Sequence, residues 1–189
     1  ESQGFIAGKN EPCAFYNPKT KVLLESFVDD LIGRGPDQPV REFMKALAVR
    51  FKCKPPNYLT QNTPLDHLGM TFFRTSKGTY LSMENHINTM IHNLGLDTTK
   101  FRKVRTPISC PVMDFKPLSP DEAKFFMSGT GMIGWLSVNG RPDLKYCHSR
   151  ISQHLASPNR GALANLLHAV KYCYWSKSLC LHQAEGKEV

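Results

Sequence analysis

The sequence has no long apolar run and no cysteine framework. Nowhere do apolar residues approach the roughly 18–20 consecutive positions of a membrane-spanning helix, and the first ten residues lack a signal-peptide pattern. Neither a C-x-x-C pair nor a close histidine pair accompanies the six scattered cysteines, which are Cys13, Cys53, Cys110, Cys147, Cys173 and Cys180. We therefore expect an intracellular protein of the cytoplasm or nucleus with reduced thiols, and no disulfide framework or zinc site.

Acidic side chains are also scarce. There are 16 Asp and Glu against 24 Lys and Arg, which gives a net charge of +8 on 189 residues. A positive excess of this size on a small chain favours a polyanionic partner, nucleic acid above all. The hydrophobic content of 41% and the charged content of 21% are typical of globular proteins, and the length suffices for one or two domains with a buried core.

Two adjacent carboxylates, Asp29 and Asp30, lie between apolar runs in residues 21–35, KVLLESFVDDLIGRG. An Asn-Pro-Lys-Thr turn signal at 17–20 comes before them, so the pattern predicts a β-hairpin that leads into a second tight turn at the aspartates. Neighbouring carboxylates repel each other, and Mg²⁺, which prefers oxygen ligands, would relieve that repulsion. Aspartate is also common in plain solvated turns, so the pair alone leaves both interpretations open.

Apolar periodicity and capping signals predict the remaining elements. Helices are expected over residues 37–51, 83–94, 120–139, 142–155 and about 162–175, with Asp37, Ser82 and Ser119 as N-caps. Strands Leu65–Arg74 and Thr79–Ser82 are expected to pair around a turn at 75–78, and another strand to begin within Ser178–His182. Three prolines make 107–118 an irregular linker. This order of elements predicts an α+β fold.

Residues 129–134 spell G-x-G-x-x-G, which is the pattern of dinucleotide-binding loops. Such a loop needs a strand before it and an acidic residue some 20 positions later. Here the motif follows a capped helix start, and Gln153 and His154 occupy the position of the acid. The glycines are therefore interpreted as points of close helix–helix contact, and Gly69 in a strand as either a bulge or a close approach to another backbone.

Four cations and an aromatic residue are concentrated in the segment KFRKVR, residues 100–105. Such a segment is typical of phosphate contact, with Phe101 available to pack on a base or sugar. A solvated run of charges would have the same sequence, so both interpretations stay open. The candidate nucleic-acid-binding cations are Lys100, Arg102, Lys103 and Arg105.

The box Phe27-Val28-Asp29-Asp30 resembles the (Tyr/Phe)-x-Asp-Asp box of reverse transcriptases, most closely those of copia-type LTR retrotransposons. Glu11–Phe15 is similar to the strand before the box, Leu68-Gly69-Met70 to the primer-grip strand, and Leu81-Ser82 to the thumb entry. Further motifs follow in the family's order: Thr106-Pro107, Leu118-Ser119-Pro120, Arg141-Pro142-Asp143 and Ala156-Ser157-Pro158. The resemblance extends from Gly4 to Gln183.

This resemblance implies a partial polymerase palm over residues 1–82, made of antiparallel β-hairpins with a packed helix. A helical thumb and connection would follow over 83–183, and a polar tail over 184–189. It implies RNA-directed DNA polymerase chemistry, with Asp29 and Asp30 as catalytic ligands of Mg²⁺ or Mn²⁺ and an RNA/DNA template–primer as partner. Leu68, Gly69 and Met70 would grip the primer, while the cations of residues 100–105 would contact the template–primer backbone.

The metal pair of nucleotidyl transfer needs a further carboxylate, which the resemblance places upstream of Asp29. Only Glu1 and Glu11 precede the hairpin as acids. We therefore expect this chain to be part of a longer polyprotein. It would hold the metal only when the missing carboxylate is supplied, and it would not polymerise nucleotides by itself.

Departures from the family pattern indicate a drifted copy. Phe27 stands where Tyr is commoner, Asn139-Gly140 precedes Arg141 where Thr is frequent, and Trp175-Ser176-Lys177 stands where Lys-Gly-Thr is usual. The alternative function is therefore a retrotransposon-derived subunit of a larger assembly, structural or nucleic-acid-binding and without catalysis. A basic scaffold protein with no metal is a third possibility.

Overall fold

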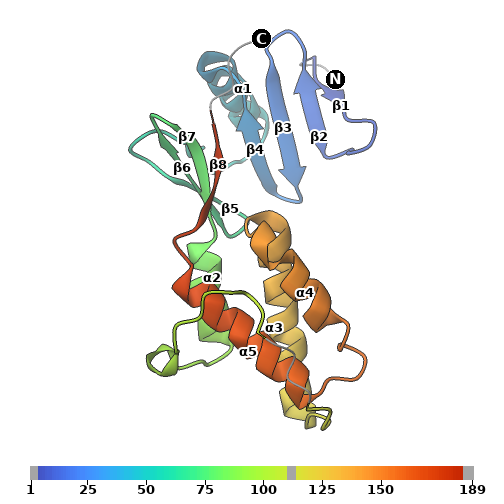
Figure 1. Cartoon of the computed structure of the whole chain (residues 1–189). Coiled ribbons are helices and arrows are strands. Elements are labelled where there is room, and N and C mark those ends of the chain that lie inside the picture. The colour runs from blue at the N-terminus through green and yellow to red at the C-terminus, as the bar shows by residue number, and fades with distance from the viewer. Residues whose placement is uncertain (1–3, 110–113, 185–189) are drawn as a thin grey trace. The chain divides into compact units, whose positions relative to one another are not determined.

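The computed structural model describes residues 4–109 and 114–184, which adopt an α+β fold as the sequence predicts (Figure 1). By its internal contacts the chain divides into two compact units, Glu1–Asn57 and Tyr58–Val189. The functional boundary at residue 82 that the family resemblance implies stays a prediction. Glu1, Cys110 and residues 185–189 of the expected polar tail lie outside the described residues.

Within residues 4–57, the first unit forms a four-stranded antiparallel sheet with one helix. The strand order is β1-β2-β3-β4, with bounds Ile6–Ala7, Ala14–Asn17, Val22–Phe27 and Asp30–Arg34. Strands β2, β3 and β4 form the two consecutive hairpins that the turn signals predict. Helix α1, Asp37–Arg50, follows at once, and Asp37 is its first residue rather than the predicted N-cap, a position that Pro36 takes.

The two faces of this sheet differ in burial because side chains alternate along a strand. Val22 and Leu24 are buried on one face, where Val40 of α1 lies next to Leu24 at Gly33. The strand register places Ile6, Tyr16 and Phe27 on the other face, and all three are exposed. Helix α1 therefore packs on one face only.

The second unit contains a sheet of order β5-β6-β7-β8, with bounds Leu65–His67, Met70–Thr75, Gly78–Ser82 and Cys180–Gln183. The prediction of one continuous strand over Leu65–Arg74 was wrong. A two-residue turn at Leu68-Gly69 divides it, and the flanking His67 and Met70 pair with each other. Both turn residues have positive φ, 50° and 77°, a conformation that glycine adopts at little cost. Gly69 therefore marks a hairpin turn and not a bulge within a strand.

In the part of this unit that the structure describes, four α-helices and two short 3₁₀ turns accompany the sheet. The helices are α2 Glu84–Asn93, α3 Pro120–Asn139, α4 Lys145–Ser152 and α5 Arg160–Trp175; the 3₁₀ turns are η1 Thr98–Lys100 and η2 Pro142–Leu144. The predicted capping box of α3 is confirmed: Ser119 Oγ accepts from the Glu122 N–H, and the Glu122 carboxylate accepts from the Ser119 N–H.

Two predicted helix boundaries need correction. Met83 occupies the N-cap position of α2, although the hydroxyl of Ser82 does accept a hydrogen bond from the Glu84 N–H at 3.2 Å. Helix α4 ends at Ser152, so Leu155 lies beyond it and is exposed. The exposed polar residues after Ser152 offer no apolar face that would extend the helix.

The helices bury a continuous apolar core. The predicted apolar face of α2 is confirmed as buried and consists of Met83, Ile87, Met90, Ile91 and Leu94. It packs with residues of α3, η2, α4 and α5, among them Phe126, Ile133, Leu144, Ile151, Leu166 and Val170. No helix among the described residues is both long and apolar enough to cross a membrane.

Two of the three motif glycines in α3 lie at close helix contacts, as predicted. A Cβ on Gly129 would lie 2.8 Å from Leu166 Cδ2 of α5, and one on Gly134 would lie 2.8 Å from His148 Nε2 of α4. Gly131 has nothing within 4 Å of that position. The motif therefore belongs to helix packing, with Gly131 not taking part.

Alanine substitution should separate these glycines. We expect Gly129→Ala to lower the free energy of unfolding by about 1–2 kcal/mol, because overpacking against the fully buried Leu166 outweighs the gain in helix propensity. Gly131→Ala is the matched control and should raise it by up to about 1 kcal/mol. Urea unfolding followed by circular dichroism measures both, and equal midpoints for the two variants would contradict the packing role.

Candidate functional site

The two aspartates lie at the tip of the β3–β4 hairpin. Phe27 pairs with Asp30, so Val28 and Asp29 form a two-residue turn. Val28 has φ 55° and is 89% exposed, and both aspartates are exposed. A β-branched residue at positive φ costs on the order of 1–3 kcal/mol and persists where the surrounding structure enforces it, often at functional sites. The hairpin thus presents both carboxylates to solvent on a tight turn.

The donor chemistry at this tip fits a divalent metal only in part. Carboxylate oxygens suit Mg²⁺, but the ion prefers six oxygen ligands in octahedral geometry. Within residues 4–109 and 114–184, no group of three His, Cys, Asp or Glu side chains lies close enough together to hold a metal ion. Asp29 and Asp30 are therefore candidate ligands that need a partner from beyond the described residues, and their metal-binding role stays a prediction.

The primer-grip candidates occupy the β5–β6 turn. Leu68 and Gly69 form the turn, and Met70 begins β6 with its side chain packed against the helical core. A Cβ on Gly69 would lie 3.8 Å from His86 Nδ1 of α2, which is an ordinary contact. Met70 thus has a packing role, while the contact of this turn with a primer stays a prediction.

The cations of residues 100–105 belong to a segment that lies along helix α5, here called the basic strap (residues 100–106). The Phe101 ring contacts the Tyr174 ring edge-on, with centroids 5.4 Å apart. Lys103 Nζ lies 6.0 Å from the centroid of the Trp175 ring, and His168 Nε2 lies 2.9 Å from the carbonyl oxygen of Thr106. These contacts hold the strap on the helix.

The four cations of the strap are exposed while Phe101 is half-buried. Neither residues 98–109 nor helix α5 contain an acidic residue, so the strap and the helix beneath it carry positive charge alone. The described ion pairs lie at its margins: Lys100 Nζ is 3.2 Å from Asp97, and Lys177 Nζ is 2.8 Å from Glu84. Exposed cations on an anchored segment suit contact with a phosphate backbone.

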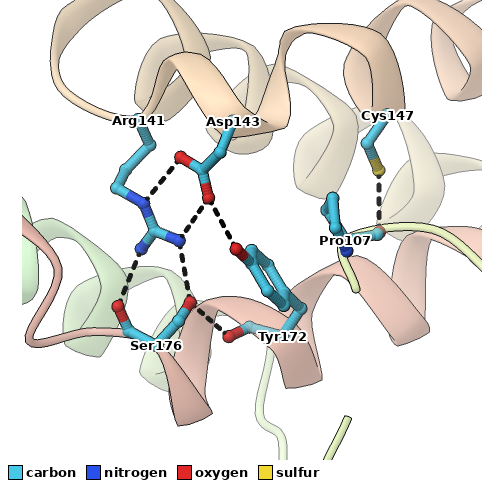
Figure 2. A network of polar contacts seen from close by, with 6 residues as sticks. All are labelled: Pro107, Arg141, Asp143, Cys147, Tyr172 and Ser176. Carbon is cyan, nitrogen blue, oxygen red and sulfur yellow. Dashed lines mark hydrogen bonds and ion pairs between the residues drawn. The ribbon is translucent and has the colours of Figure 1, made fainter. Parts of the chain in front are cut away.

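An ionic network around the buried Arg141 fixes the end of α5 next to the strap (Figure 2). Arg141 is 1% exposed and donates to both carboxylate oxygens of Asp143, at 3.0 and 2.8 Å. It also donates to the carbonyl oxygen and the hydroxyl of Ser176, at 3.1 and 2.7 Å. The Tyr172 hydroxyl donates to Asp143 at 2.9 Å. The network therefore joins η2, at the start of α4, to the last turn of α5.

Burial and ion pairing shift the pKa values of Arg141 and Asp143 in opposite directions. Burial raises the pKa of the Asp143 carboxyl, but the hydrogen bonds from Arg141 and Tyr172 outweigh it and leave the pKa below its usual range. Burial likewise lowers the pKa of Arg141, and Asp143 more than restores it. Nearby, burial raises the pKa of the Cys173 thiol to about 12, so this thiol stays protonated at neutral pH.

The comparisons with known proteins connect this chain to a mobile element. No family model and no solved structure matches it. The "Putative transposon Ty5-1 protein" of Saccharomyces cerevisiae is 23% identical over 176 residues, which cover 89% of this chain and 54% of the yeast protein. The chain is similar to a transposon protein. It spans about half the length of that curated relative.

Sequence reasoning found the aspartates and the cations but missed Trp175 and the Arg141 network. The spacing in Arg141-Pro142-Asp143 was interpreted only as a helix start and a family motif. An Arg and an Asp two positions apart could have suggested an ion pair, but its partners Tyr172 and Ser176 lie about 30 residues away along the chain. Sequence alone carries no signal for that contact.

Asp143 should make part of the stability of the protein dependent on pH. Because its pKa is lowered in the folded state, its contribution is present above the unfolded-state value of about 3.9 and is lost as pH falls through the folded value. We expect Asp143→Asn to destabilise by about 1–3 kcal/mol at pH 7, the range for hydrogen bonds to a charged group. The difference from wild type should shrink below about pH 4, as measured by denaturation at a series of pH values; a constant difference would contradict it.

The basic strap should contribute to salt-dependent binding of nucleic acid. Changing Lys100, Arg102, Lys103 and Arg105 to Gln should reduce the slope of log affinity against log salt by up to about 3–4, since four phosphate contacts are lost. The matched control removes the same charge from exposed lysines of the first unit, namely Lys9, Lys19, Lys45 and Lys52. Fluorescence anisotropy with an RNA/DNA duplex measures both slopes. Equal flattening in the two variants would mean that the strap has no special role.

Proposed function

We propose that this chain is the palm-hairpin and thumb portion of a copia-type retrotransposon RNA-directed DNA polymerase. The observation that carries the proposal is the pair of exposed carboxylates, Asp29 and Asp30, at the tip of a hairpin whose two-residue turn is strained at Val28. The similarity to a transposon protein of yeast supports the relation to mobile elements. The basic strap supplies a surface suited to a template–primer backbone.

In this function Asp29 and Asp30 would hold a pair of Mg²⁺ or Mn²⁺ ions, together with a carboxylate from outside the described residues. When bound, such ions activate the primer 3′-hydroxyl and neutralise the triphosphate and the departing pyrophosphate. The turn keeps the two carboxylates together at the hairpin tip, where solvent and substrate can reach them. The strap cations would bind phosphates of the template–primer, and the Leu68-Gly69 turn would contact the primer.

One observation favours the alternative of a nucleic-acid-binding subunit without catalysis. The contacts described for the basic strap come from the second compact unit, through Tyr174, Trp175 and His168 of α5. Phosphate binding by the strap therefore needs nothing from the aspartate hairpin in the first unit. A chain that had lost polymerase activity would keep this capacity.

Metal binding separates the two functions. We expect Asp29→Asn and Asp30→Asn each to weaken Mn²⁺ binding at least about tenfold, because each removes a charged ligand from the proposed site. Electron paramagnetic resonance of Mn²⁺ measures this on the longer polyprotein that supplies the missing carboxylate, and Glu25→Gln, which removes an exposed acid of strand β3, is the matched control. Primer extension is measured in parallel on the longer polyprotein that the proposal requires, where Asp29→Asn should abolish it.

Unchanged Mn²⁺ binding and unchanged primer extension in both aspartate variants would overturn the polymerase proposal. Nucleic-acid binding that persists without any metal uptake would support the non-catalytic subunit instead.

A further inference from the structure

Trp175 is the exposed end of a chain of three aromatic rings. It is the last residue of α5 and is 43% exposed. Its ring contacts Tyr174 at a centroid distance of 5.1 Å and an interplanar angle of 77°, and Tyr174 contacts Phe101 at 5.4 Å and 88°. The half-buried Phe101 and Tyr174 thus support an indole that keeps a large part of its surface accessible.

The backbone directly after Trp175 is fixed by several contacts. Ser176 follows directly, and its carbonyl oxygen and hydroxyl accept hydrogen bonds from the buried Arg141. The Ser176 N–H donates to Tyr172 at 3.0 Å, and Lys177 pairs with Glu84 of α2. Because the backbone that carries the indole is held in this way, less conformational freedom is lost when a ligand stacks on it, which favours binding.

From this geometry we infer that Trp175 and Lys103 form a site for one unpaired nucleobase and its adjacent phosphate. The indole supplies the stacking surface, and Lys103 Nζ, 6.0 Å from the ring centroid, lies within reach of the phosphate next to a base stacked there. Both faces of a base inside a duplex are already stacked on neighbours. An unpaired base has free faces and can therefore occupy the indole, whereas the other strap cations can bind either form.

This site rests on the proposed nucleic-acid binding by the basic strap and deepens it. It adds a preference for single-stranded segments over duplex alone. Trp175 is also one of the residues at which the chain departs from the reverse transcriptase pattern, so the site is a property of this chain and not one carried over from the family resemblance.

Trp135 provides a matched control. It lies on α3 and has similar exposure, 39%. Its ring lies 6.3 Å from the imidazole of His86. Burial lowers the pKa of His86, so this neighbour is neutral at pH 7, unlike Lys103. If bases stacked on any exposed tryptophan, both Trp135 and Trp175 would contribute to binding. If the site consists of Trp175 and Lys103, only Trp175 contributes.

The test uses three fluorescein-labelled DNA probes that share one duplex: a blunt end, a short thymidine overhang, and the same overhang with abasic sites. The wild-type chain should bind the thymidine overhang about tenfold more tightly than the abasic one. Trp175→Ala should abolish this difference without changing affinity for the blunt duplex, and Trp175→Phe should retain most of it. Trp135→Ala should keep the full difference, and circular dichroism confirms that each variant is folded.

Equal affinity of the wild-type chain for the thymidine and abasic overhangs would overturn the inference. Trp175→Ala weakening all three probes alike would also overturn it, because that result means that the indole only supports the strap. Either result leaves the proposed nucleic-acid binding by the strap standing, provided that the slope of log affinity against log salt still depends on its four cations. If that slope is insensitive to them, or if no probe binds, the proposed nucleic-acid binding fails as well.

Discussion

The guanidinium of Arg141 is buried in the helical unit, and the packing of that unit depends on how it is paired. A charged group that is removed from water is tolerated only where hydrogen bonds and an opposite charge replace the lost solvent. Asp143 supplies the charge from the adjacent 3₁₀ turn, and Ser176 supplies two acceptors from the end of α5. The start of α4 and the end of α5 are therefore held together, and with them Trp175 and the basic strap.

The two candidate sites depend on different physical properties. The aspartate tip is formed by backbone pairing of β3 and β4, and its exposed turn residues contribute little packing, so its geometry is local. The strap has no regular structure after η1 and takes its position from side-chain contacts with α5. The geometry of the aspartate tip therefore depends on one hairpin, whereas the position of the strap depends on the folded helical unit.

Local signals predicted most of the elements because they act within a few residues. The capping box at Ser119 follows from residue spacing within α3, and the buried face of α2 from residue spacing within α2. The failures were also local. The run from Leu65 to Arg74 has strand propensity throughout, so its division at Leu68-Gly69 depended on a turn that the strand pattern concealed. Leu155 continued an apolar spacing beyond the end of α4 at Ser152.

By itself the sequence determined the α+β class, the tight turn at Asp29 and Asp30, and the cluster of cations at 100–105, since each is set by residues adjacent in the chain. Tertiary structure alone decided that this cluster lies along α5 next to Trp175, that Arg141 reaches Ser176, and that Gly129 and Gly134 but not Gly131 receive neighbouring helices. Those contacts join residues from 14 positions apart, as in Gly134 and His148, to 72 positions apart, as in Lys103 and Trp175. The packing of the whole core determines such contacts, because no short segment of the chain contains both partners.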